Sequence, residues 1–172
     1  MENKNNKINI DSETKVYEQK PIDFSHTLEV AATCINVNAY LILRKGEKIL
    51  LHFRKNTGYC DNFYGLVSGH VEHGESATTA MIREAYEEVG IHLKLDSLKA
   101  VHVLHRKTNR LNIDIFFECC EWQGEITNRE PNKCGGLDFF ALCDLPSNTI
   151  DYIKVTLKAI HEGIFYSESG WK

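Results

Sequence analysis

The sequence predicts an α+β fold, in which strands and two helices build a single domain. Segments with the alternating or continuous apolar residues of β-strands recur along the chain from residue 28 onward. Two segments, at about 77–89 and 148–162, instead repeat apolar residues three and four positions apart, which indicates amphipathic helices. A chain of 172 residues has the usual length of one domain with its own core.

The N-terminal segment differs from the rest of the chain in composition. Residues 1–26 contain four lysines and five acidic residues, and few apolar side chains. Such a segment cannot bury enough apolar surface to offset the conformational entropy lost on folding. We therefore predict a polar N-terminal arm at 1–26 and a folded domain at 27–172.

The first strands of this domain are predicted from a hairpin pattern. Two apolar segments, Leu28–Leu43 and Lys48–Arg54, are separated by the turn-forming residues 45–47. A polar loop at 56–63 then leads to a short strand, Tyr64–Ser68.

The first helix can be predicted from its ends as well as from its periodicity. Ser76 is a suitable N-cap, although Thr79 at the third helical position does not complete a capping box. Gly90 can adopt the left-handed conformation that ends a helix. The apolar face is formed by Ala77, Ala80, Met81, Ile82, Ala85, Tyr86 and Val89.

The second half of the chain contains further strands and the last helix. Strands are predicted near Ala100–His105, Ile113–Trp122 and Leu137–Ala141. The helix is predicted over Asn148–Glu162. Its core-facing stripe consists of Ile150, Ile153, Leu157 and Ile160.

Three carboxylates are concentrated on one face of the first helix. Glu84, Glu87 and Glu88 are three and four residues apart, so their side chains are neighbours. Like charges at this spacing destabilise a helix by a few tenths of a kcal/mol per pair, roughly. Arg83 is predicted to lie to one side of this face, where it cannot neutralise all three. A Mg2+ or Mn2+ ion could do so, because these cations prefer oxygen ligands; the alternative is a simply solvated acidic face.

A longer pattern surrounds these glutamates. Gly69 is followed by Glu75, by Arg83-Glu84, by Glu87-Glu88 and by Gly90, with a fixed spacing that resembles the Nudix box at residues 69–91. The chain is similar to the MutT-like members of the Nudix hydrolase family. The resemblance implies the Nudix α/β/α sandwich with a mixed central β-sheet.

The resemblance also implies a metal site. In the family, the glutamates that match Glu84 and Glu88 are metal ligands, and the one that matches Glu87 commonly joins them. The residue before the box glycine, here Ser68, often contributes its backbone carbonyl, a suitable hard ligand. Family members cleave a nucleoside diphosphate linked to another group, as water attacks phosphorus and metal ions stabilise the developing charge. The expected cofactor is Mg2+, with Mn2+ as the alternative.

Other residues of the pattern are expected to support or to perform the chemistry. The glutamate that matches Glu75 tends to pair with the arginine that matches Arg83, which ties the loop that begins at Gly69 to the helix. The base that activates water varies within the family, and Glu84 is one candidate. Glu130, in a turn-rich loop, is the other and resembles an additional metal ligand of MutT-like members. The alternative for Glu130 is an ordinary solvated loop carboxylate.

Candidate substrate contacts are more weakly indicated. Arg54 could hold a phosphate with a bidentate guanidinium fork, and so could Arg106. His70 lies in the loop expected on the phosphate side. Tyr64 and Phe139 are aromatic candidates for contact with a base, with plain packing as the alternative.

Composition limits the partners and the location. A net charge of -4 argues against binding to a nucleic acid polymer, which requires a basic surface. The chain has neither an apolar stretch long enough for a membrane helix nor a signal-peptide core. Its six cysteines form no Cys-x-x-Cys pair, so free thiols in a reducing cytoplasm are expected. Whether the chain forms a homodimer is left open.

The function expected from the sequence is Mg2+-dependent hydrolysis of a nucleoside triphosphate, standard, oxidised or otherwise non-standard, to the monophosphate and pyrophosphate. One alternative is hydrolysis of ADP-ribose, a nucleotide sugar or another nucleoside diphosphate derivative. ADP-ribose is disfavoured because a proline that its hydrolases often carry downstream of the box is missing. A second alternative is a catalytically silent, nucleotide-binding regulatory domain, which the complete set of box carboxylates disfavours.

Overall fold

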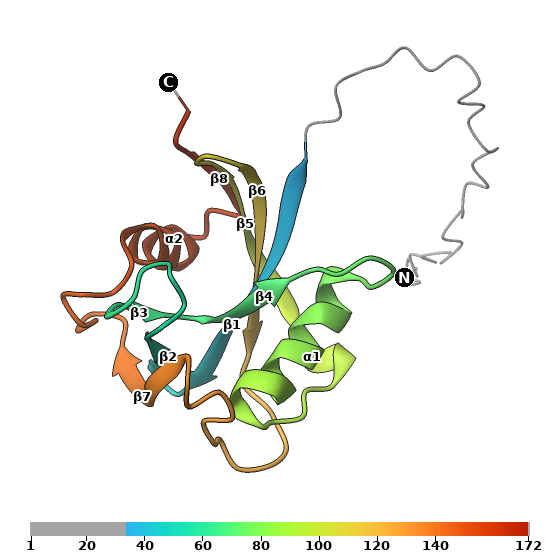
Figure 1. The fold of residues 1–172 in the computed structure, drawn as a ribbon, viewed down its shortest axis with the longest axis vertical. Helices are drawn as coiled ribbons and strands as arrows, with labels where there is room; N and C mark the ends of the chain where they lie inside the picture. The colour runs from blue at the N-terminus through green and yellow to red at the C-terminus, as the bar shows by residue number, and fades with distance from the viewer. Residues whose placement is uncertain (1–33, 172) are drawn as a thin grey trace, which may run out of the picture. The chain divides into compact units, whose positions relative to one another are not determined.

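The computed structural model describes residues 34–171, so the predicted arm at 1–26 and the beginning of the strand predicted from Leu28 lie outside the described residues. Helices and strands follow one another from the hairpin to a C-terminal strand (Figure 1). Their bounds are β1 Ile35–Lys45, β2 Lys48–Arg54, β3 Tyr64–Gly65, β4 Val67–His70, α1 Ala77–Val89, the 3-10 turn Leu95–Ser97, β5 Lys99–Lys107, β6 Leu111–Cys119, β7 Cys134–Ala141, α2 Asp151–His161 and β8 Tyr166–Ser169.

The strands form one mixed sheet. Its order is β3-β2-β1-β6-β5-β8, while β4 also pairs with β1 and β7 with β2. The pairs β1–β6 and β5–β8 are parallel, whereas β1–β4, β2–β7 and β5–β6 are antiparallel. The prediction of a mixed central sheet is confirmed.

The two faces of the sheet carry separate apolar cores. On β1, Ala39 and Leu41 belong to the core that contains the buried residues of α1, whereas Tyr40 and Ile42 belong to the core that contains those of α2. Successive side chains of a strand point to opposite faces, so β1 is buried on both sides. The fold is therefore an α/β/α sandwich, as the resemblance implied.

Helix α1 begins and ends where the sequence predicted. The Ser76 side chain accepts a hydrogen bond from the backbone N–H of Thr79 at 3.1 Å, which caps the helix. Gly90 ends it with a left-handed φ of 74°. Helix α2 also forms within its predicted range, with Ile153 and Leu157 buried.

The strand predicted over Tyr64–Ser68 is divided in the structure. Gly65 pairs with His52 of β2, whereas Ser68 pairs with Tyr40 of β1. The chain therefore changes its partner strand at Leu66, and a local apolar pattern carries no information about such a change. The change places Ser68 and the residues that follow it against β1, where β4 also contacts α1.

Strand ends and one further strand also differ from the prediction. Strand β7 begins at Cys134 rather than Leu137, because Cys134 and Gly136 pair with β2 on either side of a register shift between Phe53 and Arg54. Strand β6 ends at Cys119, before the predicted end at Trp122. Strand β8 was not predicted, and it forms by parallel pairing with β5, distant in sequence.

All six cysteines are free thiols, as expected from the sequence. Cys119 is buried and its neighbour Cys120 is exposed, in keeping with the alternation of a strand. Within residues 34–171, no helix has the length and apolar character needed to cross a membrane.

Candidate active site

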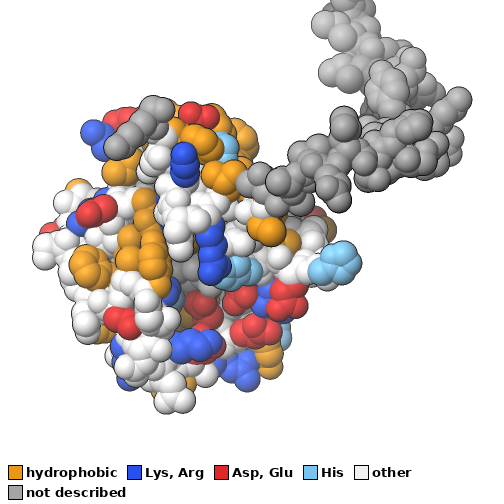
Figure 2. All heavy atoms as spheres, turned by 45° about the horizontal axis from the view of Figure 1, so that its top comes forward, with side chains coloured by type: hydrophobic (Ala, Val, Ile, Leu, Met, Phe, Trp, Pro, Cys, Tyr) orange, Lys and Arg blue, Asp and Glu red, His pale blue; other side chains and the backbone are white. Residues whose placement is uncertain are grey.

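A cavity of about 540 Å³ lies between α1, β4 and the loop that precedes β7. Its lining includes all the residues that were predicted to hold metal, namely Ser68, Glu84, Glu87, Glu88 and Glu130. Glu130 thus lines the same cavity as the three glutamates of α1. Figure 2 shows acidic side chains gathered beside lysine, arginine and histidine side chains on one face of the molecule.

Glu84 lies directly against the backbone of β4. A Cβ atom added to Gly69 would overlap the Glu84 carboxylate, so only glycine allows this approach. Burial raises the pKa of Glu84 above its usual range, and the hydrogen bond from Arg83 opposes this rise. The role of Gly69 is therefore to make room for a half-buried carboxylate.

Replacing Gly69 with alanine should reduce turnover at least about tenfold, because the new methyl group must displace Glu84 or β4. Overpacking of this kind costs about 1–3 kcal/mol of stability. Steady-state kinetics and thermal unfolding would measure the two effects. The matched control is Gly136→Ala, since a Cβ there meets no atom within 4 Å. Equal activity of the two variants would contradict the prediction.

Arg83 connects the loop, the strand and the helix. Its Nη2 lies 2.7 Å from Glu75 Oε1 and donates to the carbonyl of His70 at 3.1 Å. Its Nη1 donates to Glu84 at 2.7 Å and to Glu87 at 3.1 Å. The predicted Glu75 pair is present, and Arg83 contacts two glutamates of the acidic face, Glu84 and Glu87. No contact with Glu88 is found among the described residues, so Arg83 does not neutralise all three carboxylates, as predicted. Hydrogen bonding from Arg83 lowers the pKa of Glu75.

Among the carboxylates that line the cavity, Glu88 is the one that is largely buried and also lacks a strong hydrogen-bond donor. Its side chain is 13% exposed, and His52 Nδ1 lies 3.4 Å from Oε2 in a contact that is not a hydrogen bond. Within the described chain, Oε2 has no hydrogen-bond partner. A buried carboxylate oxygen without a donor is costly unless a cation compensates for it.

His52 was not identified from the sequence. It lies on β2 and is buried, and its Nε2 also lacks a partner among residues 34–171. Its proximity to Glu88 arises from the packing of a helix against a distant strand. A histidine in an apolar strand carries no local signal of such a contact.

Glu130 is held at the cavity by its own loop. Its backbone carbonyl accepts hydrogen bonds from the N–H groups of Lys133 and Cys134. Its carboxylate accepts a hydrogen bond from Lys133 Nζ at 2.7 Å, which raises the pKa of Lys133. The loop is therefore ordered by a turn, and the carboxylate has a cationic neighbour.

The donor chemistry of the cavity suits a hard divalent cation. All the predicted ligands are oxygen atoms, four carboxylates and the Ser68 carbonyl, and Glu88 Oε2 lacks a donor. Within residues 34–171, no three His, Cys, Asp or Glu side chains converge on one point as a closed ligand cage. A divalent cation held here by one or two carboxylates would therefore need water or phosphate oxygens to complete its coordination.

A second cavity, of about 450 Å³, adjoins the first across β4. Arg54, Ser68, Gly69 and His70 line both cavities. Arg54 is oriented by hydrogen bonds from Nε to the carbonyl of Tyr59 at 3.0 Å and from Nη2 to Thr57 Oγ1 at 3.1 Å. Two predicted substrate contacts, Arg54 and His70, thus lie where the cavities meet.

The structure does not bring Tyr64 and Phe139, the other two predicted substrate contacts, to the site. Tyr64 packs edge-on against Phe53 and Phe140, with ring centroids 5.2 and 5.1 Å apart. Phe139 packs against the apolar core on the α1 face, and Lys45 Nζ lies 5.8 Å from its ring centroid. Neither residue lines the two cavities.

Known proteins resemble the chain in both sequence and fold. Residues 33–158 match the NUDIX domain model. An ADP-ribose pyrophosphatase of Methanocaldococcus jannaschii is 34% identical over 115 residues, which span 66% of each chain, slightly less than two thirds of that relative. The crystal structure of a MutT NUDIX hydrolase from Burkholderia pseudomallei is similar at a TM-score of 0.67 and 25% identity, over 73% of this chain and 97% of that one. A MutT protein from Methanosarcina mazei Go1 shares the fold, at a TM-score of 0.66 and 17% identity, over 79% and 97% of the respective chains.

The sandwich fold, with a helix packed on each face of a mixed sheet, is the class of protein that the chain shares with these structural relatives. Within this class the chain belongs to the NUDIX family, whose model covers most of its length.

Proposed function

We propose that the protein is a divalent-cation-dependent pyrophosphohydrolase of a nucleoside diphosphate derivative, with compounds of the ADP-ribose type as the first candidates. The observation that carries the proposal is the gathering of Glu84, Glu87, Glu88 and Glu130 in one cavity that continues into a second, polar cavity. If the diphosphate were bound at the glutamates, the groups linked to it could extend into the second cavity. The name of the Methanocaldococcus relative favours ADP-ribose over the triphosphates that the sequence suggested.

The residues would have different roles, according to where they lie in the site. A bound Mg2+ would supply charge neutralisation for the phosphate oxygens, held by the four glutamates and the Ser68 carbonyl. Glu84 or Glu130 would accept the proton of the attacking water, because both line the cavity. Arg83 and Glu75 would keep the β4–α1 loop in place, and Arg54 would orient a phosphate with its guanidinium group.

A second candidate substrate is a nucleoside triphosphate, cleaved to the monophosphate and pyrophosphate. It is supported by the likeness to the MutT NUDIX hydrolase of Burkholderia pseudomallei. The silent regulatory domain has less support, since a module that only binds nucleotide does not need four carboxylates around one cavity. A cytoplasmic location and a homodimer stay predictions.

Turnover should depend on a divalent cation. We expect ADP-ribose, nucleotide sugars or triphosphates to be cleaved in Mg2+ or Mn2+, and activity to vanish in EDTA and return with excess metal. Product analysis would separate the candidates: AMP and ribose 5-phosphate from ADP-ribose, or pyrophosphate from a triphosphate. Thermal unfolding in EDTA would control for loss of the fold. A folded protein that binds Mg2+ but cleaves none of these compounds would argue against the proposal.

A further inference from the structure

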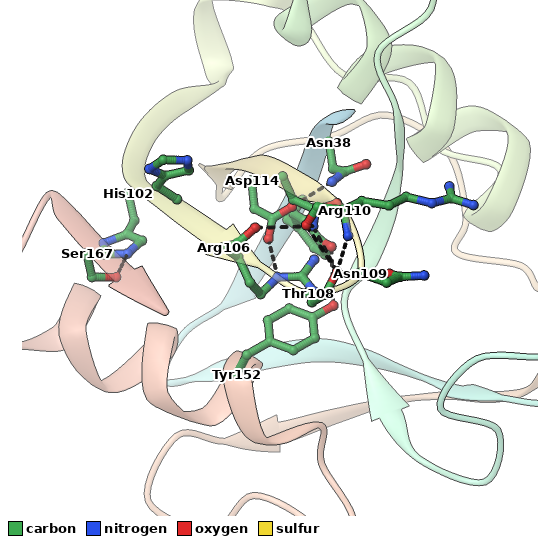
Figure 3. A network of polar contacts seen from close by, with 12 residues as sticks. Asn38, His102, Arg106, Thr108, Asn109, Arg110, Asp114, Tyr152 and Ser167 are labelled. Atoms are coloured by element: carbon green, nitrogen blue, oxygen red, sulfur yellow. Dashed lines mark hydrogen bonds and ion pairs between the residues drawn. The ribbon is translucent and has the colours of Figure 1, made fainter. Parts of the chain in front are cut away.

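The buried charges at the second cavity are fully paired. Arg106 Nε donates to Asp114 Oδ2 at 2.6 Å, and Asn38 Nδ2 donates to Asp114 Oδ1 at 2.6 Å (Figure 3). Asp114 is fully buried, and the guanidinium Cζ of Arg106 also lies 4.2 Å from the ring centroid of Tyr152. Buried polar groups in native proteins are hydrogen-bonded as a rule, and this network follows the rule.

The buried histidine of strand β5 also has a partner for each ring nitrogen. His102 is fully buried, its Nδ1 lies 2.8 Å from the carbonyl oxygen of Ile164, and its Nε2 lies 2.8 Å from Ser167 Oγ. Figure 3 shows the contact with Ser167. One nitrogen can donate to the carbonyl while the other accepts from the hydroxyl, as a neutral imidazole requires. His102 is thus a satisfied residue of the fold, and it lines neither of the two cavities.

His52, the buried histidine that lines the glutamate cavity, departs from this rule. Its Nε2 has no hydrogen-bond partner among residues 34–171, and its Nδ1 faces Glu88 Oε2, an atom that also has none there. Both side chains are largely buried. Unpaired buried polar atoms are rare in native structures, so this pair calls for an explanation beyond the packing of the fold.

The contact with Glu88 indicates where the histidine carries a proton. An N–H group at Nδ1 would point its positive end at the negative Oε2, 3.4 Å away, whereas a lone pair at Nδ1 would be repelled by it. A proton on Nε2 would stay unpaired within the described chain. The geometry therefore favours the form of the ring with an N–H group at Nδ1, directed at the carboxylate.

The ring of His52 is held more firmly than the carboxylate it faces. His52 pairs with Gly65 of β3 on one side and with Leu137 of β7 on the other, so its backbone is fixed within the sheet. A Cβ added to Gly65 would lie 3.3 Å from Nε2, so the ring has little room to withdraw from Glu88. Groups that contact a metal ligand from behind fix its orientation.

We propose that His52 is a positioning residue, whose Nδ1–H group orients the Glu88 carboxylate toward the divalent cation. The inference rests on the proposed function, because Glu88 is a metal ligand only in that proposal. His52 itself is not assigned any contact with the cation or with the substrate.

Nuclear magnetic resonance of the wild-type chain tests the proposal without any variant or turnover. Long-range 1H–15N spectra, assigned through the backbone, distinguish a protonated from an unprotonated ring nitrogen. We expect a proton on Nδ1 of His52 and a shift of this nitrogen resonance on saturation with Mg2+, while the ring signals of His102 stay in place. A proton on Nε2 alone, or a Nδ1 resonance that does not move when Mg2+ is bound, would overturn the proposal.

Metal affinity in the absence of nucleotide tests the residue itself. Mn2+ would be added to the chain, and free Mn2+ measured by electron paramagnetic resonance. His52→Leu should weaken binding by about 10–100-fold, the effect typical of groups that orient a metal ligand. His52→Asn should recover most of the affinity, because its amide nitrogen stands where Nδ1 does, whereas the amide of His52→Gln reaches the place of Nε2 and should recover less. Wild-type affinity in His52→Leu, or no recovery in His52→Asn, would overturn the proposal.

Thermal unfolding in EDTA separates positioning from a merely structural role. His52→Leu removes a buried nitrogen that has no partner, so its stability should be equal or higher. The matched control is His102→Leu, which leaves the Ile164 carbonyl and the Ser167 hydroxyl without the ring and should unfold at a lower temperature, but should bind Mn2+ as the wild type does. A loss of stability with unchanged metal affinity in His52→Leu would mark a structural residue and overturn the proposal.

These results can be separated from a failure of the proposed function. Metal binding that depends on His52, in a protein that cleaves no phosphoanhydride, would contradict only the proposed function. Metal-dependent turnover in a protein whose metal affinity does not depend on His52 would contradict only the positioning role.

Discussion

Glu88→Gln should lower kcat/KM at least about a hundredfold while it preserves the fold. A catalytic metal ion supplies several kcal/mol of transition-state stabilisation, and each 1.4 kcal/mol corresponds to a factor of about ten in rate. Glu88 is the carboxylate in the cavity whose Oε2 is buried without a hydrogen-bond donor among the described residues. Glutamine would remove the charge with little change in shape, so the protein should still fold and should bind Mg2+ or Mn2+ more weakly in a titration.

The same substitution should leave thermal stability in EDTA equal or higher. A buried, poorly compensated charge opposes folding, so its removal relieves this cost. Glu87→Gln should have a smaller effect on turnover, because its side chain is 53% exposed and already paired with Arg83. The control is Glu162→Gln, on the surface at the end of α2. The Glu162 carboxylate lies 3.9 Å from Lys158 Nζ. Retention of full activity and metal affinity by Glu88→Gln would remove Glu88 from the site.

The parts of the fold that the sequence predicted are those with local causes. Helix α1 could be bounded because Ser76 and Gly90 act on the backbone next to them. The change of partner strand at Leu66 could not be predicted, because it depends on β1 and β2 being available side by side. Strand β8 was missed for the same reason, since its backbone groups pair with β5, far away in the sequence.

The same distinction between local and distant causes applies to the candidate site. The box pattern placed Glu84, Glu87 and Glu88 on one helix, and the family resemblance implied the contact between Glu75 and Arg83 that the structure contains. Tyr64 and Phe139 were predicted to contact a base only because they are aromatic. A ring suited to stacking on a base is equally suited to packing in a core, so this prediction was wrong. The Arg106–Asp114 pair joins neighbouring strands, and Asn38 completes it only through the parallel register that places it opposite Asp114. No local pattern encodes that register.

Asp114→Asn should be the most destabilising of the polar substitutions considered. It leaves the buried Arg106 without its counter-ion, and breaking a buried pair in this way costs about 3–5 kcal/mol. For a domain of this size the midpoint of thermal unfolding should fall by roughly 10 °C. The control is Glu118→Gln, which breaks the partly exposed pair with Arg44 and should cost about 1 kcal/mol or less.

The second substitution, Arg106→Gln, should restore much of this loss when it is added to Asp114→Asn. Two neutral amides can bond to each other or to water in the cavity, so neither position then holds an unpaired charge. A double-mutant cycle should therefore give a coupling energy above about 1 kcal/mol, as expected for groups in direct contact. Additive losses would mean that the cavity hydrates Arg106 well enough to make its charge independent of Asp114. In that case Asp114 would not be what holds Arg106 in place beneath the second cavity.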